Sequence, residues 1–210
     1  MLSRAQRFRF ARSLLRLAFR LDEPEDPWQC TELDASHQVF GAGSLHEFSW
    51  YFEGESTALV SSFEEVCSWL LGCTCARDSD LFRVRDFWQH PVTFEALRKG
   101  DCEDHALWAW RKLRELGFRT HLVIGSCSRD DTDTGSHAWV IFHADGGLYL
   151  LDATAKDRNR MVWPLDSVRQ HYEPYVSVDE TFTMFVYGGY VRYLRSRGSA
   201  KRNPPPPEPS

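Results

Sequence analysis

Three residues of this 210-residue chain have the types and the order that amide-bond chemistry with a sulfur nucleophile requires. Cys102 follows Asp101 at the expected start of a helix, His137 lies in an expected strand, and Asp152 lies near the end of the next one. A thiolate attacks a carbonyl carbon, an imidazole takes and returns the proton, and a carboxylate orients the imidazole. The sequence therefore predicts a catalytic triad of Cys102, His137 and Asp152.

The helix that carries Cys102 is predicted from its start signal and its apolar spacing. Asp101 is a suitable N-cap after Gly100, and apolar residues recur at helical spacing until Gly117. In the first turn, unpaired backbone N–H groups and the helix dipole favour a thiolate, whereas the flanking carboxylates disfavour it. The hypothesis of a sulfur nucleophile therefore requires a histidine close to Cys102.

A predicted β-hairpin supplies that histidine. Its arms are residues 136–143 and 148–154, joined by a turn at residues 144–147. When the turn is centred on its middle two residues, His137 becomes a diagonal neighbour of Asp152 on one face of the sheet, within reach of its side chain. A register shifted by one residue would put the two on opposite faces. With a further strand expected at residues 119–126, the local order is a helix followed by at least three antiparallel strands.

These residues and their neighbours resemble a known family. Three segments look like the motifs of the transglutaminase-like superfamily. Residues 100–106 resemble the Cys motif, residues 136–140 the His motif and residues 150–154 the Asp motif. The Gly-Asp-Cys-Glu-Asp sequence in the first segment is most similar to the bacterial transglutaminase-like cysteine proteinases. Residues 87–91 also resemble the aromatic-to-proline segment that precedes the Cys motif. The resemblance implies a papain-like α+β fold, in which the helix with Cys102 packs on an antiparallel sheet with His137 and Asp152.

The triad and the resemblance together predict an enzyme that cleaves or transfers an amide or peptide bond through a thioacyl intermediate. Hydrolysis is expected over transamidation, because hydrolysis needs no site for a second substrate. The expected partner is a protein or peptide substrate, and no cofactor is expected. The alternative is a non-catalytic protein-interaction module that keeps the transglutaminase-like scaffold.

An oxyanion hole needs hydrogen-bond donors aimed at the developing negative charge. The backbone N–H of Cys102 is one candidate. The side chains of Trp88 and Gln89 are the other candidates, because they stand in the segment that precedes the Cys motif. For Trp88, packing in the hydrophobic core is the alternative interpretation.

Three acidic residues lie beside Cys102, namely Asp101, Glu103 and Asp104. Two roles are possible for them. Some members of the family bind calcium through acids that flank the cysteine. Helix capping and the helix dipole explain the same residues without a metal ion. We therefore interpret them as capping residues and expect no metal site.

The two ends of the chain differ from its middle. Residues 1–20 contain several arginines and no acid, which predicts a basic amphipathic helix that docks on the acidic body. The alternatives for this segment are a transit peptide and contact with an anionic membrane surface. Residues 21–200 are expected to form the transglutaminase-like domain, and residues 201–210 a disordered proline-rich tail.

Composition excludes some classes of protein. Twenty-five basic and 30 acidic residues give a net charge of −5, which does not indicate nucleic-acid binding. No apolar run has the length of a membrane-spanning helix. Because no secretory signal is recognisable, the six cysteines are expected to be reduced thiols, and the protein is expected to be cytoplasmic.

Overall fold

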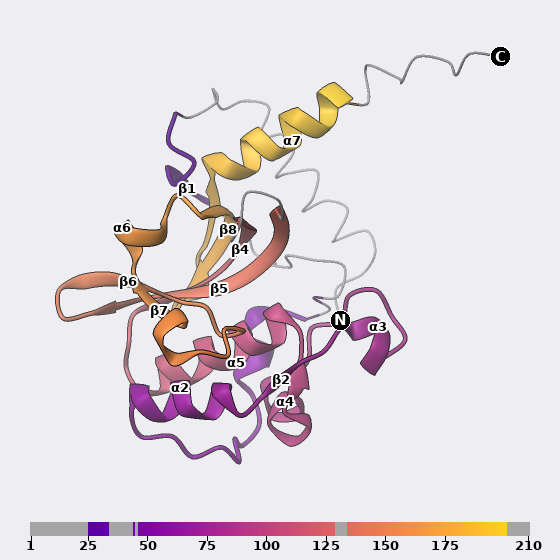
Figure 1. Cartoon of the computed structure of the whole chain (residues 1–210), viewed down its shortest axis with the longest axis vertical. Coiled ribbons are helices and arrows are strands. Elements are labelled where there is room, and N and C mark those ends of the chain that lie inside the picture. Colours follow the sequence, from indigo (N-terminus) through magenta and orange to yellow (C-terminus); the bar gives the residue numbers. More distant parts are fainter. Residues whose placement is uncertain (1–24, 34–43, 45, 129–133, 201–210) are drawn as a thin grey trace.

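A computed structural model of the protein describes residues 25–33, 44, 46–128 and 134–200. The basic helix predicted at residues 1–20 and the tail predicted at residues 201–210 lie outside these residues. The described part is a mixed helix and antiparallel-sheet fold, with most of its helices gathered on one side of the sheet (Figure 1).

The described elements fall into a main sheet, a small parallel pair and the helices around them. The main sheet has the order β1-β9-β8-β4-β5-β6-β7, and all its neighbours are antiparallel. Its strands are β1 (Cys30–Leu33), β4 (Thr120–Ser128), β5 (Thr134–Ala144), β6 (Gly147–Leu151), β7 (Val162–Pro164), β8 (Tyr172–Asp179) and β9 (Met184–Tyr187). The parallel pair is β2 (Thr74–Cys75) and β3 (Lys99–Gly100). The helices are η1 (Phe48–Phe52), α2 (Phe63–Leu71), α3 (Asp78–Leu81), α4 (Pro91–Leu97), α5 (Cys102–Glu115), η2 (Arg158–Arg160), α6 (Leu165–Val168) and α7 (Gly188–Ala200).

Helix α5 is the centre of the hydrophobic core. Its largest side chains, Leu107, Trp108, Trp110 and Leu113, are fully buried. Trp110 and Leu113 belong to the apolar pattern that predicted the helix. The helix packs against β4 and β5 on one side and against α2 and α4 on the other. The expected arrangement of a helix packed on an antiparallel sheet is therefore confirmed, and Figure 1 shows α2, α4 and α5 together below the sheet.

The hairpin of β5 and β6 has the predicted register, with Val140 opposite Leu151. Its two turn residues, Asp145 and Gly146, have φ values of 48° and 76°, the left-handed backbone that a tight two-residue hairpin turn needs. The second arm is shorter than predicted, because β6 ends at Leu151 and the chain then turns. The structure thus corrects the predicted end at residue 154.

The strands beyond this hairpin complete the sheet on the β4 side. β8 pairs with β4, and the register shifts between Ile124 and Gly125. A Cβ atom at Gly125 would overlap the backbone oxygen of Glu173, so the close approach of β8 requires glycine there.

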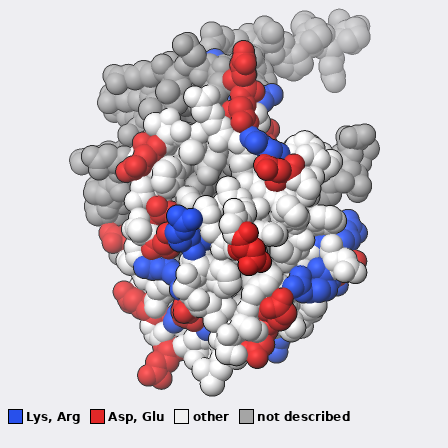
Figure 2. Space-filling view, turned by 90° about the vertical axis from the view of Figure 1, so that its left-hand side faces the viewer, with Lys and Arg blue, Asp and Glu red and all other residues white. Residues whose placement is uncertain are grey.

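The described residues contain no helix long and apolar enough to cross a bilayer. On the face that Figure 2 shows, basic and acidic side chains are interspersed among uncharged ones. No broad field of one sign covers the described part of this face.

Candidate active site

Cys102 is the first residue of α5, directly after the N-cap Asp101. The carboxylate of Asp104 accepts the backbone N–H of Asp101 at 3.3 Å, which closes a capping box and fixes the start of the helix. A Cβ atom at Gly100 would overlap the side chain of Asp104, so glycine at this position lets the chain enter the helix. The predicted helix start and its capping by acids are confirmed.

His137 and Asp152 lie next to each other at the edge of this helix–sheet junction. His137 stands on β5, and Asp152 follows the last residue of β6. The Nε2 atom of His137 and the Oδ2 atom of Asp152 are 3.1 Å apart. The two side chains are 12% and 1% exposed, so water screens their interaction only weakly. The register of the hairpin thus brings together the two residues that sequence reasoning paired.

Four hydrogen bonds converge on the carboxylate of Asp152. Its Oδ2 accepts the Tyr172 hydroxyl at 3.0 Å as well as the His137 ring, and its Oδ1 accepts the backbone N–H and the hydroxyl of Thr154 at 3.1 and 2.6 Å. An ionised carboxylate accepts hydrogen bonds and donates none, so this set fixes its position. Sequence reasoning missed Tyr172, because β8 is distant in the chain and a tyrosine in a strand gives no signal of its contacts.

A cavity of about 240 Å³ opens beside Cys102. Its walls include Trp88, Ile124, Ser136 and His137, so the thiol and the imidazole face one space. In the structure the thiol donates to Oε2 of Glu103 at 3.3 Å. Cys102 and His137 thus line the same cavity.

The surroundings of Cys102 favour the neutral thiol. Burial raises the pKa of the Cys102 thiol well above its usual value, the charges of Glu103 and Asp101 raise it further, and the backbone N–H of Ala138 opposes them. Burial also raises the pKa of Glu103 to about 10, with Asp101 and Asp104 adding to the effect. The acids therefore outweigh the helix N-terminus, and a thiolate here needs a counter-charge.

The structure separates the two side chains proposed for the oxyanion hole. Trp88 lines the cavity beside Cys102. Gln89 is fully buried, and its Nε2 donates to the backbone oxygen of Lys99 at 3.0 Å and to Asp104. Both N–H bonds of that amide are thereby used, so Gln89 is corrected from an oxyanion donor to a support of the helix start.

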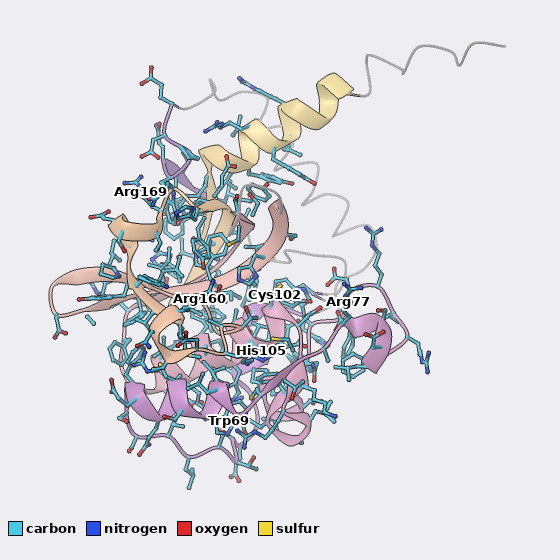
Figure 3. The ribbon with its side chains drawn as sticks, in the orientation of Figure 1. Trp69, Arg77, Cys102, His105, Arg160 and Arg169 are labelled. Carbon is cyan, nitrogen blue, oxygen red and sulfur yellow. The ribbon has the colours of Figure 1, made fainter. Side chains whose placement is uncertain are left out.

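His105 and Lys156 connect the loop after Asp152 to α5. The Nδ1 of His105 donates to the backbone oxygen of Asp101 at 2.7 Å, and its Nε2 lies 3.1 Å from Nζ of Lys156. Burial lowers the pKa of His105 to about 4, and the charge of Lys156 contributes, so the ring is neutral and accepts from the ammonium. Lys156 also donates to the backbone oxygen of Leu70 at 2.8 Å. Figure 3 shows His105 below Cys102, towards the helical layer.

Further carboxylates surround the start of α5. The ligand atoms of Asp78, Asp101 and Asp104 lie within 4.8 Å of one another, and so do those of Asp78, Asp86 and Glu103. Burial raises the pKa of Asp78 to about 6, and the charges of Asp101 and Asp86 contribute to the rise. A hydrogen bond from the backbone N–H of Phe87 acts in the opposite direction and lowers the pKa. These five acids are called the acidic cluster below. The sequence singled out only the three beside Cys102, because Asp78, at the start of α3, and Asp86, in the segment after it, are distant from Cys102 in the chain.

Comparison with protein-family models identifies the family of this chain. The family model described as bacterial transglutaminase-like cysteine proteinase BTLCP matches residues 58–166, which is more than half of the chain and includes Cys102, His137 and Asp152. No curated protein gives a significant match.

Solved structures of LapG from Legionella pneumophila are similar to this chain. The EGTA-treated LapG is 23% identical, with a TM-score of 0.42, over 54% of this chain and 60% of that one. A second LapG structure is 20% identical, with a TM-score of 0.46, over 66% and 75% of the two chains. The calcium-bound LapG is 18% identical, with a TM-score of 0.44, over 80% and 83%. This chain therefore spans less than two thirds of the EGTA-treated LapG chain.

Proposed function

This chain belongs to the family of bacterial transglutaminase-like cysteine proteinases, and from that premise we propose that it hydrolyses peptide bonds with Cys102, His137 and Asp152. The observation that carries the proposal is the 3.1 Å contact between His137 Nε2 and Asp152 Oδ2, beside a cavity that Cys102 also lines. With Nε2 directed at the carboxylate, Nδ1 is the ring atom that exchanges a proton with the thiol. Asp152 holds the tautomer and stabilises the imidazolium.

The proposed reaction has two halves. The thiol proton moves to Nδ1 of His137, the sulfur of Cys102 attacks the carbonyl carbon, and the tetrahedral oxyanion forms. His137 then protonates the leaving amine, the C–N bond breaks, and a thioester to Cys102 remains. Water adds to the thioester while His137 takes its proton, the C–S bond breaks, and the thiol recovers that proton. The imidazolium that forms when His137 takes the thiol proton also supplies the positive charge that a thiolate needs in these acidic surroundings.

The oxyanion needs donors at the mouth of the cavity. The backbone N–H of Cys102 points from the first turn of α5, where helix N–H groups have no intrahelical acceptor. Trp88, which lines the same cavity, is the side chain that we propose as a second contributor.

Peptide turnover in heavy-oxygen water tests the proposal. The full chain is incubated with a pool of peptides of defined sequence, and mass spectrometry identifies the fragments. Hydrolysis places one heavy oxygen in each new carboxylate, whereas transfer to an added primary amine gives an amide without it. We expect hydrolysis that is abolished in Cys102→Ala and preserved in Cys75→Ala, which changes an exposed cysteine outside the cavity.

Two results would count against this function. Cleavage that persists in Cys102→Ala would remove Cys102 as nucleophile. A folded wild-type protein that cleaves no peptide and forms no thioester would favour the non-catalytic interaction module.

The acidic cluster supports a second property, the binding of a calcium ion. Oδ1 of Asp78 and Oδ1 of Asp101 are buried and make no hydrogen bond within the described residues. Capping accounts for Asp104 but leaves these oxygens unexplained, and calcium prefers several carboxylate oxygens. We infer that Asp78, Asp86, Asp101 and Glu103 hold the ion, which would supply positive charge beside the thiol.

A further inference from the structure

A second cavity, of about 390 Å³, borders the network behind His137. Asp152 and Tyr172, which are joined by a 3.0 Å hydrogen bond, form part of its wall. The loop between β6 and β7 supplies most of the remaining lining, including Lys156 and Arg160. Nothing in the proposed cleavage step uses this cavity.

The acidic side chains in the cavity wall are already occupied. Asp152 accepts from His137, Tyr172 and Thr154, as described above. Asp157 caps η2, where its Oδ1 accepts the backbone N–H of Asn159 at 3.0 Å.

Lys156 and Arg160 in the wall differ in their hydrogen bonds. The ammonium of Lys156 is held by His105 and the backbone oxygen of Leu70. The guanidinium of Arg160 makes no hydrogen bond or ion pair in the described part of the chain, although it lines the cavity. A guanidinium presents a planar fork of donors that matches a carboxylate. Arg160 is exposed, so water satisfies its guanidinium, and a ligand in the cavity can replace that water.

The backbone at Arg160 is held by the neighbouring tryptophan. The indole Nε1 of Trp163 donates to the backbone oxygen of Arg160 at 3.2 Å, and Trp163 itself lines the cavity at 37% exposure. Val168 adds to the apolar part of the wall. A ligand here meets a cation and an apolar surface, which suits an acidic side chain with its methylene groups.

The two cavities lie beside different strands of the sheet. The cavity beside Cys102 includes Ile124 of β4 and Ser136 of β5, and the second cavity lies beyond β6, at the loop to β7. Figure 3 shows Cys102 and Arg160 both where the sheet meets the helical layer. The two cavities adjoin at the contact between His137, which lines the first, and Asp152, which lines the second.

We propose that the second cavity is a specificity subsite that binds an acidic side chain of the substrate peptide, with the Arg160 guanidinium on its carboxylate. The proposal rests on the proposed proteolytic function. The planar fork of the Arg160 guanidinium matches the two oxygens of a carboxylate, and the carboxylates of Asp152 and Asp157 in the same wall disfavour a dianionic phosphate.

Matched peptide pairs test the subsite. Peptides that the enzyme cleaves are resynthesised with each Asp or Glu near the cleavage site replaced by Asn or Gln. We expect kcat/KM for the acidic peptide to exceed that of its amide twin about tenfold to a hundredfold, the range for hydrogen bonds to charged groups. Arg160→Gln should remove this difference. Arg158→Gln, on the same turn, should retain it, because Arg158 lies outside the cavity and pairs with Glu64 at 3.6 Å.

A binding measurement separates this proposal from the proteolytic function. The Cys102→Ala chain, isotope-labelled at arginine, is titrated with N-acetylglutamate amide, with N-acetylglutamine amide and with inorganic phosphate. We expect only the glutamate probe to shift the side-chain resonance of Arg160 strongly. If peptides are not cleaved but this shift occurs, the cavity is an acid-binding site and the proteolytic function fails.

Three results would overturn the subsite. The first is equal cleavage of acidic and amide twins by the wild-type enzyme. The second is an equal loss of preference in Arg160→Gln and Arg158→Gln. The third is a shift of the Arg160 resonance by phosphate alone, which would make the cavity a site for free anions.

Discussion

At the scale of single residues, the position of Asp152 matters as much as its charge. Asp152 follows the end of β6, so the hydrogen bonds between β5 and β6 no longer fix its position. Side-chain hydrogen bonds hold its carboxylate in place instead. Thr154 holds one oxygen and Tyr172 holds the other, so the orientation of His137 depends on both. Tyr172 is thus a positioning residue that acts through Asp152.

Replacing Tyr172 by phenylalanine tests that role. Tyr172→Phe removes one hydrogen bond to an ionised carboxylate, whose usual worth implies a loss of roughly tenfold to a hundredfold in kcat with little change in KM. Tyr175→Phe, which changes a tyrosine on the same strand that does not line either cavity, is the matched control. Steady-state kinetics and the melting temperature are measured together. An unchanged kcat in a destabilised Tyr172→Phe protein would assign Tyr172 to the fold alone.

Residue type and order in the chain predicted part of the site. Cys102, His137 and Asp152 could be chosen because one helix start and one hairpin bring them together. The roles of Gln89 and Tyr172 could not be predicted, because both depend on contacts between elements that are distant in the sequence. An amide beside a tryptophan looks the same in the sequence whether it faces a substrate or a buried carboxylate.

At the scale of elements, a buried carboxylate fastens α4 to α5. Glu95 of α4 accepts the indole N–H of Trp108 at 2.9 Å and lies 3.6 Å from Nζ of Lys112, both on α5. It also accepts the backbone N–H groups of Thr57 and Ala58 at 2.7 and 3.2 Å. Burial alone would raise the pKa of Glu95, but the hydrogen bonds from Ser56, Trp108, Thr57 and Ala58 outweigh it and lower the pKa to about 2.

This pKa predicts how stability depends on pH. A carboxyl whose pKa falls from 4.5 to about 2 on folding stabilises the protein above pH 4.5, and this stabilisation is lost as the pH falls towards 2. Glu95→Gln should therefore lower the free energy of unfolding by about 2 kcal/mol at neutral pH, and by less near pH 3.

Urea unfolding at neutral pH, at about pH 5 and at about pH 3 measures the effect. Glu64→Gln is the control, because Glu64 is 74% exposed on α2 and its surface ion pair with Arg158 contributes little. A difference between wild type and Glu95→Gln that stays the same from neutral pH to pH 3 would contradict the prediction.

Elements differ in how well the sequence predicted them. The helix with Cys102 and the hairpin of β5 and β6 have local signals, a cap with apolar spacing in one and a tight turn in the other. β1, β8 and β9 have no such signal, because their partners are distant in the chain and only the folded sheet selects their register. The predicted α+β fold is therefore confirmed, whereas the order of the strands required the structure.

At the scale of the whole molecule, the start of α5 concentrates negative charge in a chain whose net charge is already −5. Buried carboxylates that cannot all ionise oppose the compact state, and the raised pKa values of Asp78 and Glu103 reflect this. A divalent cation in the acidic cluster would offset this repulsion in the folded state only. Binding of this kind makes global stability depend on the concentration of the ion.

Thermal unfolding in calcium and in EGTA tests this dependence. At a calcium concentration about 100-fold above the dissociation constant, binding stabilises the folded state by about 2.7 kcal/mol. For a chain of this length that corresponds to a rise in melting temperature of about 5–10 °C over EGTA. Magnesium should give a smaller rise, because it demands a tighter octahedral shell. Asp86→Asn should reduce the calcium effect and Asp166→Asn, an exposed acid on α6 outside the cluster, should preserve it. Equal melting temperatures in millimolar calcium and in EGTA would show that the acidic cluster binds no calcium in the folded protein.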